Sequence, residues 1–422
     1  MNTTAPSPLH SSRLTSIDAL RGLAALWVLV HHVIGPLITP LTARWPWMAP
    51  LLFPVAIGYV GVHLFLVISG FCIHQKLAAS TPRDEPMRLK FGEFWTRRFW
   101  RLYPPYLVVL VGCSVLMIVL NVWLHNRTLA QGLSVFWHES RWDVVTHLFM
   151  IHIFFGGFIY GMLNSPLWSL ALEEHLYLLY APFLWLRNRF SMRGALITIA
   201  CIGLAYRCFA YFVLGSRPQP AELELPVVSS YLMLQAPARW LEWCLGALAV
   251  EAAVNRRELP QWCKRWSTAA LACVGAVLVA RTPAHFLLSD MLWGLCFFSL
   301  INASVAAERR YDLATSNLPH HKLVRLFAWF GSFSYSIYLV HMPLIVLTTY
   351  LSYNAGVQNE SPMLALTRTL VIPVALVLAY VFHRVVEQRF LRPAPQIKSR
   401  STESRSLTLE PPTLAPLSRQ PA

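Results

Sequence analysis

Long apolar stretches separated by short polar loops make up most of this 422-residue chain. About ten of these stretches are long and apolar enough to cross a membrane as helices. They lie at 17–38, 51–74, 103–124, 166–186, 194–214, 237–254, 267–282, 286–305, 326–351 and 363–386. The pattern therefore predicts an all-α membrane protein with about ten transmembrane helices.

Basic residues are distributed unevenly among the loops between these stretches. Alternate loops, starting with the one between the second and third stretches, hold most of the lysines and arginines. The intervening loops hold few basic residues, namely Arg44, Arg127, Arg141, Arg217 and Arg281. Because an excess of Lys and Arg marks cytoplasmic loops, we expect both termini to be cytoplasmic. The apolar stretch 143–163 would break this alternation as a span, so we interpret it as a short re-entrant or interfacial segment.

Composition supports the membrane interpretation and excludes other classes of protein. Hydrophobic residues make up 56% of the chain and charged residues 13%, with a mean hydropathy of +0.48, whereas soluble domains carry about a quarter charged residues. The net charge of +15 comes from short loops rather than from one soluble face, so we expect no nucleic-acid partner. The eight cysteines show no CxxC pair and no metal-ligand spacing, so we expect no metal site.

The chain is expected to have three parts. Residues 1–16 form a cytoplasmic tail and residues 17–390 form the transmembrane domain. Residues 391–422 are rich in Pro, Ser and Thr, which predicts a disordered cytoplasmic tail. We therefore expect the chemistry to lie in the membrane segments and their loops.

The first apolar stretch carries ionisable residues where burial in a membrane is costly, and such residues are functional candidates. Arg21 and His32 are eleven residues apart, which places them on one face of a helix about 16 Å apart. His31 points away from that face. An arginine can hold an anionic donor, and an imidazole can take a proton from an attacking hydroxyl. The structural alternative is that Arg21 reaches the membrane interface and His32 forms an interhelical hydrogen bond.

A second basic pair lies at the start of the third stretch. Arg98 and Arg101 are three residues apart, on one helix face. Such a pair can grip the phosphates of a nucleotide-like donor. The alternative is that the two arginines anchor the helix by positive charge within an aromatic belt. Spacing alone favours this alternative.

Further ionisable residues lie in later stretches. Glu173 and Glu174 interrupt the fourth apolar stretch. A buried glutamate is either paired with a cation or protonated, so we expect a structural ion pair with Arg239 or Arg207 rather than direct catalysis. His341 is a second imidazole at membrane depth, for which an interhelical hydrogen bond and a role in the site both stay open.

In this order, the segments resemble the integral-membrane acyltransferase family 3, which includes O-acetylases of bacterial surface polysaccharides and of nodulation factors. The matching motifs are Asp18-x-x-Arg21 with His32, the glycine-containing run 58–71, Arg98-x-x-Arg101 with Pro104, Trp168-Ser-Leu-x-x-Glu173, Arg239-x-x-Glu242 with Gly246, Ser334-Tyr335 with Tyr338 and His341-x-Pro343, and Glu387. Each motif alone is loose, but together and in the family's order they make the resemblance specific.

The resemblance implies an enzyme that transfers an acyl group from cytosolic acyl-CoA, usually acetyl-CoA, to a sugar hydroxyl at the opposite face of a bacterial inner membrane. By position, His32 resembles the catalytic histidine and Arg21 its partner, while Arg98 and Arg101 resemble the donor-side arginines. The motif residues expected to support them are Asp18, Ser69, Trp168, Glu173, Arg239, Tyr335 and His341. Acyl-CoA would be a co-substrate, and no bound cofactor is implied.

Three positions depart from the family's pattern. His63 stands where many members have Asp, His31 stands where an aromatic residue is common, and Gln388 follows Glu387 in place of a basic residue. These departures leave the fold prediction unchanged. They mean that the family pattern does not specify the acceptor or the surroundings of His32.

The sequence thus predicts a membrane O-acyltransferase in which His32 is the general base that deprotonates a carbohydrate or glycolipid hydroxyl. A covalent acyl-histidine is an alternative route. One competing class is a transporter or flippase of an anionic or lipid-linked solute, although the sequence shows no internal repeat. Another is a haem-binding electron carrier that uses His31 or His32 together with His341.

Overall fold

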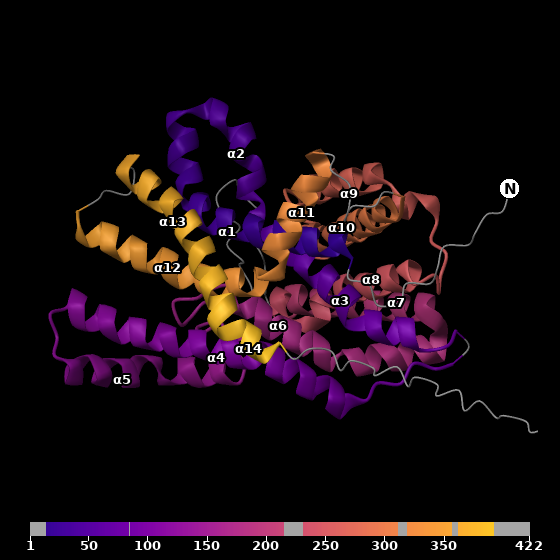
Figure 1. The fold of residues 1–422 in the computed structure, drawn as a ribbon, viewed down its shortest axis with the longest axis horizontal. Helices are drawn as coiled ribbons and strands as arrows, with labels where there is room; N and C mark the ends of the chain where they lie inside the picture. The colour runs from indigo at the N-terminus through magenta and orange to yellow at the C-terminus, as the bar shows by residue number, and fades with distance from the viewer. Residues whose placement is uncertain (1–13, 84, 215–230, 311–318, 357–361, 392–422) are drawn as a thin grey trace, which may run out of the picture.

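The computed structural model describes residues 14–83, 85–214, 231–310, 319–356 and 362–391. Within these ranges every regular element is helical, which confirms the all-α prediction. The α-helices labelled in Figure 1 are α1 (Thr15–Arg44), α2 (Ala49–Ala56), α3 (Gly61–Ser80), α4 (Phe91–Leu124), α5 (Leu129–Leu148), α6 (Leu167–Leu178), α7 (Tyr180–Phe212), α8 (Ala236–Ala253), α9 (Trp266–Val279), α10 (His285–Arg310), α11 (Pro319–Ser332), α12 (Ser334–Asn354), α13 (Pro362–Phe382) and α14 (Gln388–Phe390). The shorter elements are 3-10 turns at Pro46–Met48, Gly58–Val60, His152–Phe154, Tyr231–Leu234 and Gln261–Lys264, and a π-helical turn at His383–Glu387. The expected tails 1–16 and 391–422 lie almost entirely outside the described residues.

Seven helical segments of the described chain are long and apolar enough to cross a membrane. They are Thr15–Arg44, Pro46–Ser80, Phe91–Leu124, Tyr180–Phe212, His285–Arg310, Ser334–Asn354 and Ala365–Phe390. The predicted count of about ten is not confirmed, because three expected spans correspond to helices that are short or charged. α6 has 12 residues and α9 has 14, which is too short for a complete crossing. α8 carries Arg239, Glu242 and Glu251 within 18 residues.

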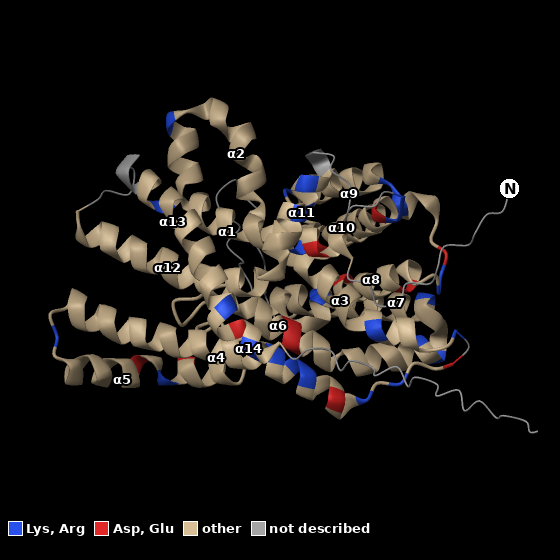
Figure 2. Ribbon diagram, in the orientation of Figure 1, with Lys and Arg blue, Asp and Glu red and all other residues tan. Residues whose placement is uncertain are grey.

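Charged residues concentrate in one half of the molecule. Figure 2 shows most Lys, Arg, Asp and Glu positions in the right half of the view, around α3, α7, α8 and the start of α4. The part of α4 that follows Arg101 and the whole of α12, on the left, hold no Lys, Arg, Asp or Glu. Leu14 and Leu391, the first and last residues that the structure describes, line the same cavity. The two ends of the described chain therefore border one cavity. That these ends face the cytoplasm stays a prediction.

The apolar stretch 143–163 does not form one helix. α5 ends at Leu148, and the backbone then continues irregularly around the short 3-10 turn His152–Phe154. Met150, Met162 and Leu163 adopt positive φ angles of 54°, 55° and 52°, which interrupt any helix. A continuous helical span across this stretch is therefore excluded, and its expected re-entrant or interfacial position stays a prediction.

Two pairs of helices approach so closely that only glycine fits between them. Gly22 of α1 and Gly331 of α11 each face a backbone carbonyl oxygen of the opposite helix. Gly70 of α3 and Gly246 of α8 make the same reciprocal approach. A Cβ atom at any of the four would overlap that backbone. The glycine-containing run 58–71 thus permits close helix packing at Gly70. The two contacts fix α1 and α3, which carry the first of the predicted site residues.

Glu251 of α8 is fully buried and joins three segments of the chain to that helix. Its carboxylate accepts hydrogen bonds from Arg187 Nε at 2.6 Å and Arg257 Nε at 3.0 Å. His74 Nε2 lies 3.1 Å from the same carboxylate. The negative charge is therefore surrounded by positive and polar groups from α3, α7 and the loop after α8.

We predict that Glu251→Gln lowers the free energy of unfolding by about 3–5 kcal/mol, because two arginines lose a buried negative partner. Thermal unfolding of the protein in detergent measures the change. Glu93→Gln is the matched control, since Glu93 forms only exposed ion pairs and its loss is expected to leave the melting temperature unchanged. Equal melting temperatures for wild type and Glu251→Gln would contradict this role.

Candidate active site

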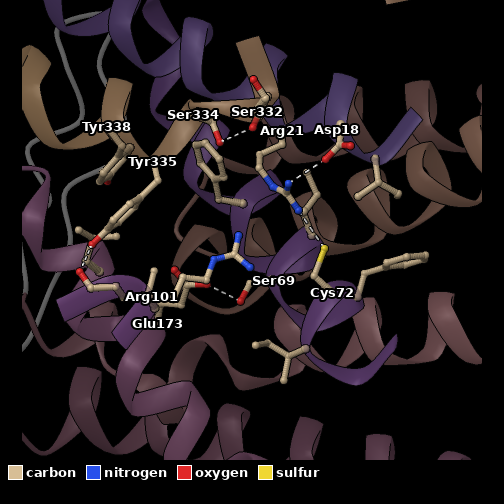
Figure 3. Close-up of a pocket in the computed structure, with 18 of the residues that line it drawn as sticks. Asp18, Arg21, Ser69, Cys72, Arg101, Glu173, Ser332, Ser334, Tyr335 and Tyr338 are labelled. Carbon is tan, nitrogen blue, oxygen red and sulfur yellow. Dashed lines mark hydrogen bonds and ion pairs between the residues drawn. The ribbon is translucent and has the colours of Figure 1, made fainter. Parts of the chain in front are cut away.

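A cavity of about 700 Å³ lies where α1, α3, α4, α6 and α12 meet the π-helical turn (Figure 3). It brings together seven of the eleven residues that the sequence singled out. Those seven are Asp18, Arg21, Ser69, Arg98, Arg101, Glu173 and Tyr335. His32, Trp168, Arg239 and His341 are not among its lining residues. The predicted donor-side residues therefore share one cavity, and the predicted catalytic histidine lies apart from them.

Arg21 projects from α1 into the cavity and is held there at both ends of its guanidinium. Nη1 donates to Asp18 Oδ1 at 2.9 Å, and Nη2 donates to Cys72 Sγ of α3 at 3.0 Å. Figure 3 draws both contacts as dashed lines. These contacts favour a position in the cavity wall over the alternative in which Arg21 only reaches the membrane interface.

Arg98 and Arg101 of α4 add positive charge to the same wall. The Arg98 guanidinium lies 5.9 Å from the centre of the Tyr177 ring. Neither arginine forms an ion pair with any residue that the structure describes. The nearby carboxylates already have side-chain partners, as in the pair between Asp18 and Arg21. The two guanidinium groups are therefore available to an anionic ligand.

Glu173 of α6 is bound by hydroxyl groups from two helices. Ser69 of α3 donates to Glu173 Oε1 at 2.6 Å. Tyr177, one turn further along α6, donates to the same oxygen at 2.5 Å. Trp243 Nε1 in turn lies 3.3 Å from the Ser69 hydroxyl. Glu173 thus joins α3 and α6 at the cavity wall.

The predicted ion pair between Glu173 and Arg239 or Arg207 is wrong. Arg239 Nη1 lies 2.9 Å from Asp290 Oδ1 and 3.2 Å from Glu242 Oε1. Arg207 Nη2 lies 2.5 Å from Asp290 Oδ2. α6 directs Glu173 into the cavity, whereas both arginines face α10. Asp290 was missed because no sequence spacing relates it to them.

The cluster around Arg239 has ligand types that suit a metal ion. His63, Glu242 and Asp290 offer ligand atoms within 4.8 Å of one another. Arg239 Nη1, however, lies 3.1 Å from His63 Nδ1 and equally close to the two carboxylates. Because the guanidinium already supplies positive charge between these groups, we interpret the cluster as an ion-pair network that joins α3, α7, α8 and α10.

His32 and His341 contact each other and lie next to the cavity wall at Tyr338. Their ring centres are 5.2 Å apart, and His341 Nε2 lies 3.3 Å from His32 Nδ1. Tyr338 lines the cavity and its ring centre lies 5.8 Å from that of His341, while Phe65 packs against Tyr338. His31 turns away to a backbone carbonyl. The direct contact between His32 and His341 leaves no space for a porphyrin between them, which argues against the haem interpretation.

Two predicted residues support the site from outside its charged wall. The Tyr335 hydroxyl donates to the carbonyl of Leu102 at 2.7 Å and so ties α12 to α4 next to Arg101. Trp168 packs against the hydrophobic core instead of lining the cavity. The following residue, Ser169, lines the cavity and hydrogen-bonds the Tyr338 hydroxyl.

Sequence reasoning missed two residues of the cavity wall that its own periodicity indicates. Cys72 follows Ser69 by three residues and Tyr177 follows Glu173 by four, spacings that place each pair on one helix face. The π-helical turn is a different case. It directs Glu387 into the cavity and into a 2.7 Å hydrogen bond with His383, and such turns are frequent at functional sites.

Known proteins resemble this chain over most of its length. The acyltransferase domain family matches residues 14–384. The peptidoglycan O-acetyltransferase OatA of Listeria monocytogenes is 27% identical over 358 residues, which cover 79% of this chain and 50% of that protein. The O-acetyltransferase OatA of Staphylococcus aureus is 27% identical over 214 residues, which cover 50% of this chain and 32% of that protein.

The chain spans about half the length of the Listeria relative and a smaller part of the Staphylococcus relative. No solved structure matches it. The family match runs from the start of α1 to the π-helical turn and includes nearly every residue of the cavity wall. The protein therefore belongs to the integral-membrane acyltransferase family 3.

Proposed function

We propose that this protein is a membrane O-acyltransferase that moves an acyl group from acyl-CoA to a carbohydrate hydroxyl. The proposal is carried by a cavity in which Arg98 and Arg101 have no ion-pair partner among the described residues and whose wall at Tyr338 adjoins two contacting imidazoles, in a chain of this family. The names of the relatives specify O-acetyl transfer and, for the Listeria protein, peptidoglycan. We therefore propose acetyl as the acyl group and a cell-envelope glycan or glycolipid as the acceptor, with peptidoglycan the first to test.

The charged wall of the cavity suits the nucleotide end of acyl-CoA. Phosphate groups form charge-assisted hydrogen bonds with guanidinium groups, often two at a time. Arg98 and Arg101 would bind the phosphates, since neither has a competing carboxylate partner among the described residues. Arg21 would orient the donor deeper in the cavity. The donor would enter from the part of the cavity wall that Leu14 and Leu391 line, which we assign to the cytoplasmic side of a bacterial inner membrane.

His32 would act as the general base next to the cavity wall at Tyr338. It takes the proton of the acceptor hydroxyl as the oxygen attacks the thioester carbonyl carbon. The C–S bond then breaks, the CoA sulfur leaves with the proton that His32 held, and the new ester stays on the glycan. Arg21 lies about 16 Å along α1 from His32, so it is better placed to orient the donor than to stabilise the developing oxyanion.

A transport function is not favoured. The known relatives are named for group transfer. Acyl transfer explains both the arginine-lined cavity and the adjacent imidazoles.

We predict that Arg98→Ala and Arg101→Ala each raise the KM for acetyl-CoA by about tenfold or more, because each removes charge-assisted hydrogen bonds to phosphate. Steady-state kinetics measures the change. Arg97→Ala is the matched control, since Arg97 does not line the cavity and forms an exposed ion pair with Glu93. Acetyl-pantetheine, which lacks the nucleotide phosphates, is expected to react equally well with all these variants. A raised KM for this truncated donor would contradict phosphate binding by the two arginines.

Release of CoA thiol tests the proposed function directly. Purified protein in lipid vesicles is given acetyl-CoA with and without peptidoglycan, and free thiol is measured over time. We expect release that rises with peptidoglycan and is lost in Arg98→Ala/Arg101→Ala at low donor concentration. No release from folded protein with peptidoglycan or any other envelope glycan supplied would refute acyl transfer.

A further inference from the structure

We propose that His341 is a positioning residue whose neutral imidazole accepts a hydrogen bond from His32 and thereby leaves His32 Nε2 as the basic nitrogen. This role rests on the proposed function of His32 as general base. The two side chains come from α1 and α12, which are 309 residues apart in sequence at these positions.

The hydrogen bonds of His341 fix its own tautomer first. His341 is 1% exposed, and its Nδ1 lies 3.0 Å from the carbonyl oxygen of Ile337. A carbonyl oxygen only accepts hydrogen bonds, so Nδ1 must carry the proton. In the neutral ring, Nε2 then has a free lone pair. This lone pair lies 3.3 Å from His32 Nδ1.

The tautomer of His32 follows from the same argument. Its Nδ1 lies 3.0 Å from the carbonyl oxygen of Val28, which again requires a proton on Nδ1. The Nδ1 proton is therefore shared between Val28 and the bare Nε2 of His341. Nε2 of His32 keeps its lone pair, and no hydrogen bond from the described residues occupies it. The contacts of Nδ1 thus determine that Nε2 is the nitrogen that can take a proton.

The contact also gains strength during the reaction. When His32 Nε2 takes the proton of the acceptor hydroxyl, the ring becomes cationic and its Nδ1–H becomes a stronger donor. A hydrogen bond with an ionised partner is roughly twice as strong as one between neutral groups. His341 would therefore stabilise the transition state more than the ground state, which raises kcat without tightening donor binding. A catalytic triad uses a carboxylate in this position, whereas this chain uses a second imidazole.

Three variants of the full-length protein in vesicles test the role. In His341→Leu, the leucine side chain occupies the volume of the imidazole but has no hydrogen-bond acceptor for His32. His341→Gln places an amide oxygen near the position of Nε2 and can still accept from His32. His147→Leu is the matched control, because His147 is also fully buried and bonded to the carbonyl one turn earlier, at 2.9 Å, but does not contact His32. The readouts are kcat, the KM for acetyl-CoA and the melting temperature.

We expect His341→Leu to lower kcat by about 10- to 100-fold, the effect of losing one hydrogen bond to a charged group, with KM unchanged. We expect His341→Gln to restore most of kcat and His147→Leu to leave kcat unchanged. Wild-type kcat in His341→Leu, or equal losses in His341→Leu and His341→Gln, would overturn the positioning role. Full activity in His32→Ala would instead refute the role of His32 as the base. Failure of the proposed function is therefore distinguishable from failure of the positioning role of His341.

Discussion

Replacement of His32 by alanine is expected to lower acetyl transfer by about 10²- to 10⁴-fold, the range that a general base contributes. The half-buried ring presents Nε2 without a hydrogen bond from the described residues, while Nδ1 is held by Val28 and His341. Without this nitrogen, the acceptor hydroxyl has no positioned base. The donor cavity does not include His32, so binding of acetyl-CoA is expected to stay unchanged.

Transfer of labelled acetyl to the glycan measures the first effect, and equilibrium binding of acetyl-CoA measures the second. His31→Ala is the matched control, because His31 is the adjacent residue but donates instead to the carbonyl of Val55 at 2.9 Å. It is expected to keep most of the transfer activity. A His32→Ala protein that keeps more than about a tenth of wild-type transfer would contradict a base that acts in the rate-limiting step.

Substitution of alanine for Gly70 or Gly246 is expected to destabilise the folded protein strongly. An added Cβ at Gly70 would overlap the carbonyl oxygen of Trp243, and one at Gly246 would overlap that of Val67. Overlap with flexible side chains costs about 1–3 kcal/mol. Here the overlapping atoms belong to the backbone of a neighbouring helix, so α3 and α8 must separate and the cost should exceed that range.

The yield of monodisperse protein and its melting temperature measure this loss. Gly112→Ala is the control, since nothing lies within 4 Å of a Cβ atom there. One separation of α3 from α8 would relieve both overlaps, so the Gly70→Ala/Gly246→Ala double variant should lose less stability than the sum of the single variants. Strict additivity, or wild-type melting temperatures, would show that these helices do not approach as closely as the structure places them.

The sequence predicted the charged wall of the cavity because that wall follows helix periodicity. Asp18 and Arg21 are three residues apart and so are Arg98 and Arg101, and each pair emerges on one side of its helix. The same rule would have added Cys72 and Tyr177. Local spacing is sufficient where the functional residues share a helix.

Contacts between helices could not be predicted in this way. The partner of Glu173 from another helix is the Ser69 hydroxyl of α3, 104 residues earlier, and Arg239 pairs with Asp290 on α10. Which helices meet depends on where their backbones can approach closely, as at Gly70 and Gly246. A single sequence does not indicate which helix lies opposite each of these glycines. The count of about ten spans is not confirmed for a related reason, because apolar length alone does not distinguish a crossing helix from a short buried one such as α6.

The π-helical turn at His383–Glu387 also lay beyond sequence reasoning. One extra residue in the turn changes which side chains face the cavity, and no residue type marks its position. Glu387 was identified from the sequence only as part of a family motif. The structure supplies its contacts, with Ser336 at 2.6 Å and His383 at 2.7 Å.

The most direct test of the central claim is mass spectrometry of the acceptor. Purified protein in vesicles is incubated with isotopically labelled acetyl-CoA and peptidoglycan fragments, and the glycans are then analysed for labelled ester groups. We predict base-labile labelled acetyl on the glycan with wild-type protein and at least about 100-fold less with His32→Ala. Unmodified glycan after incubation with folded wild-type protein, together with intact substrate that has crossed the vesicle membrane, would contradict acyl transfer and indicate a transporter.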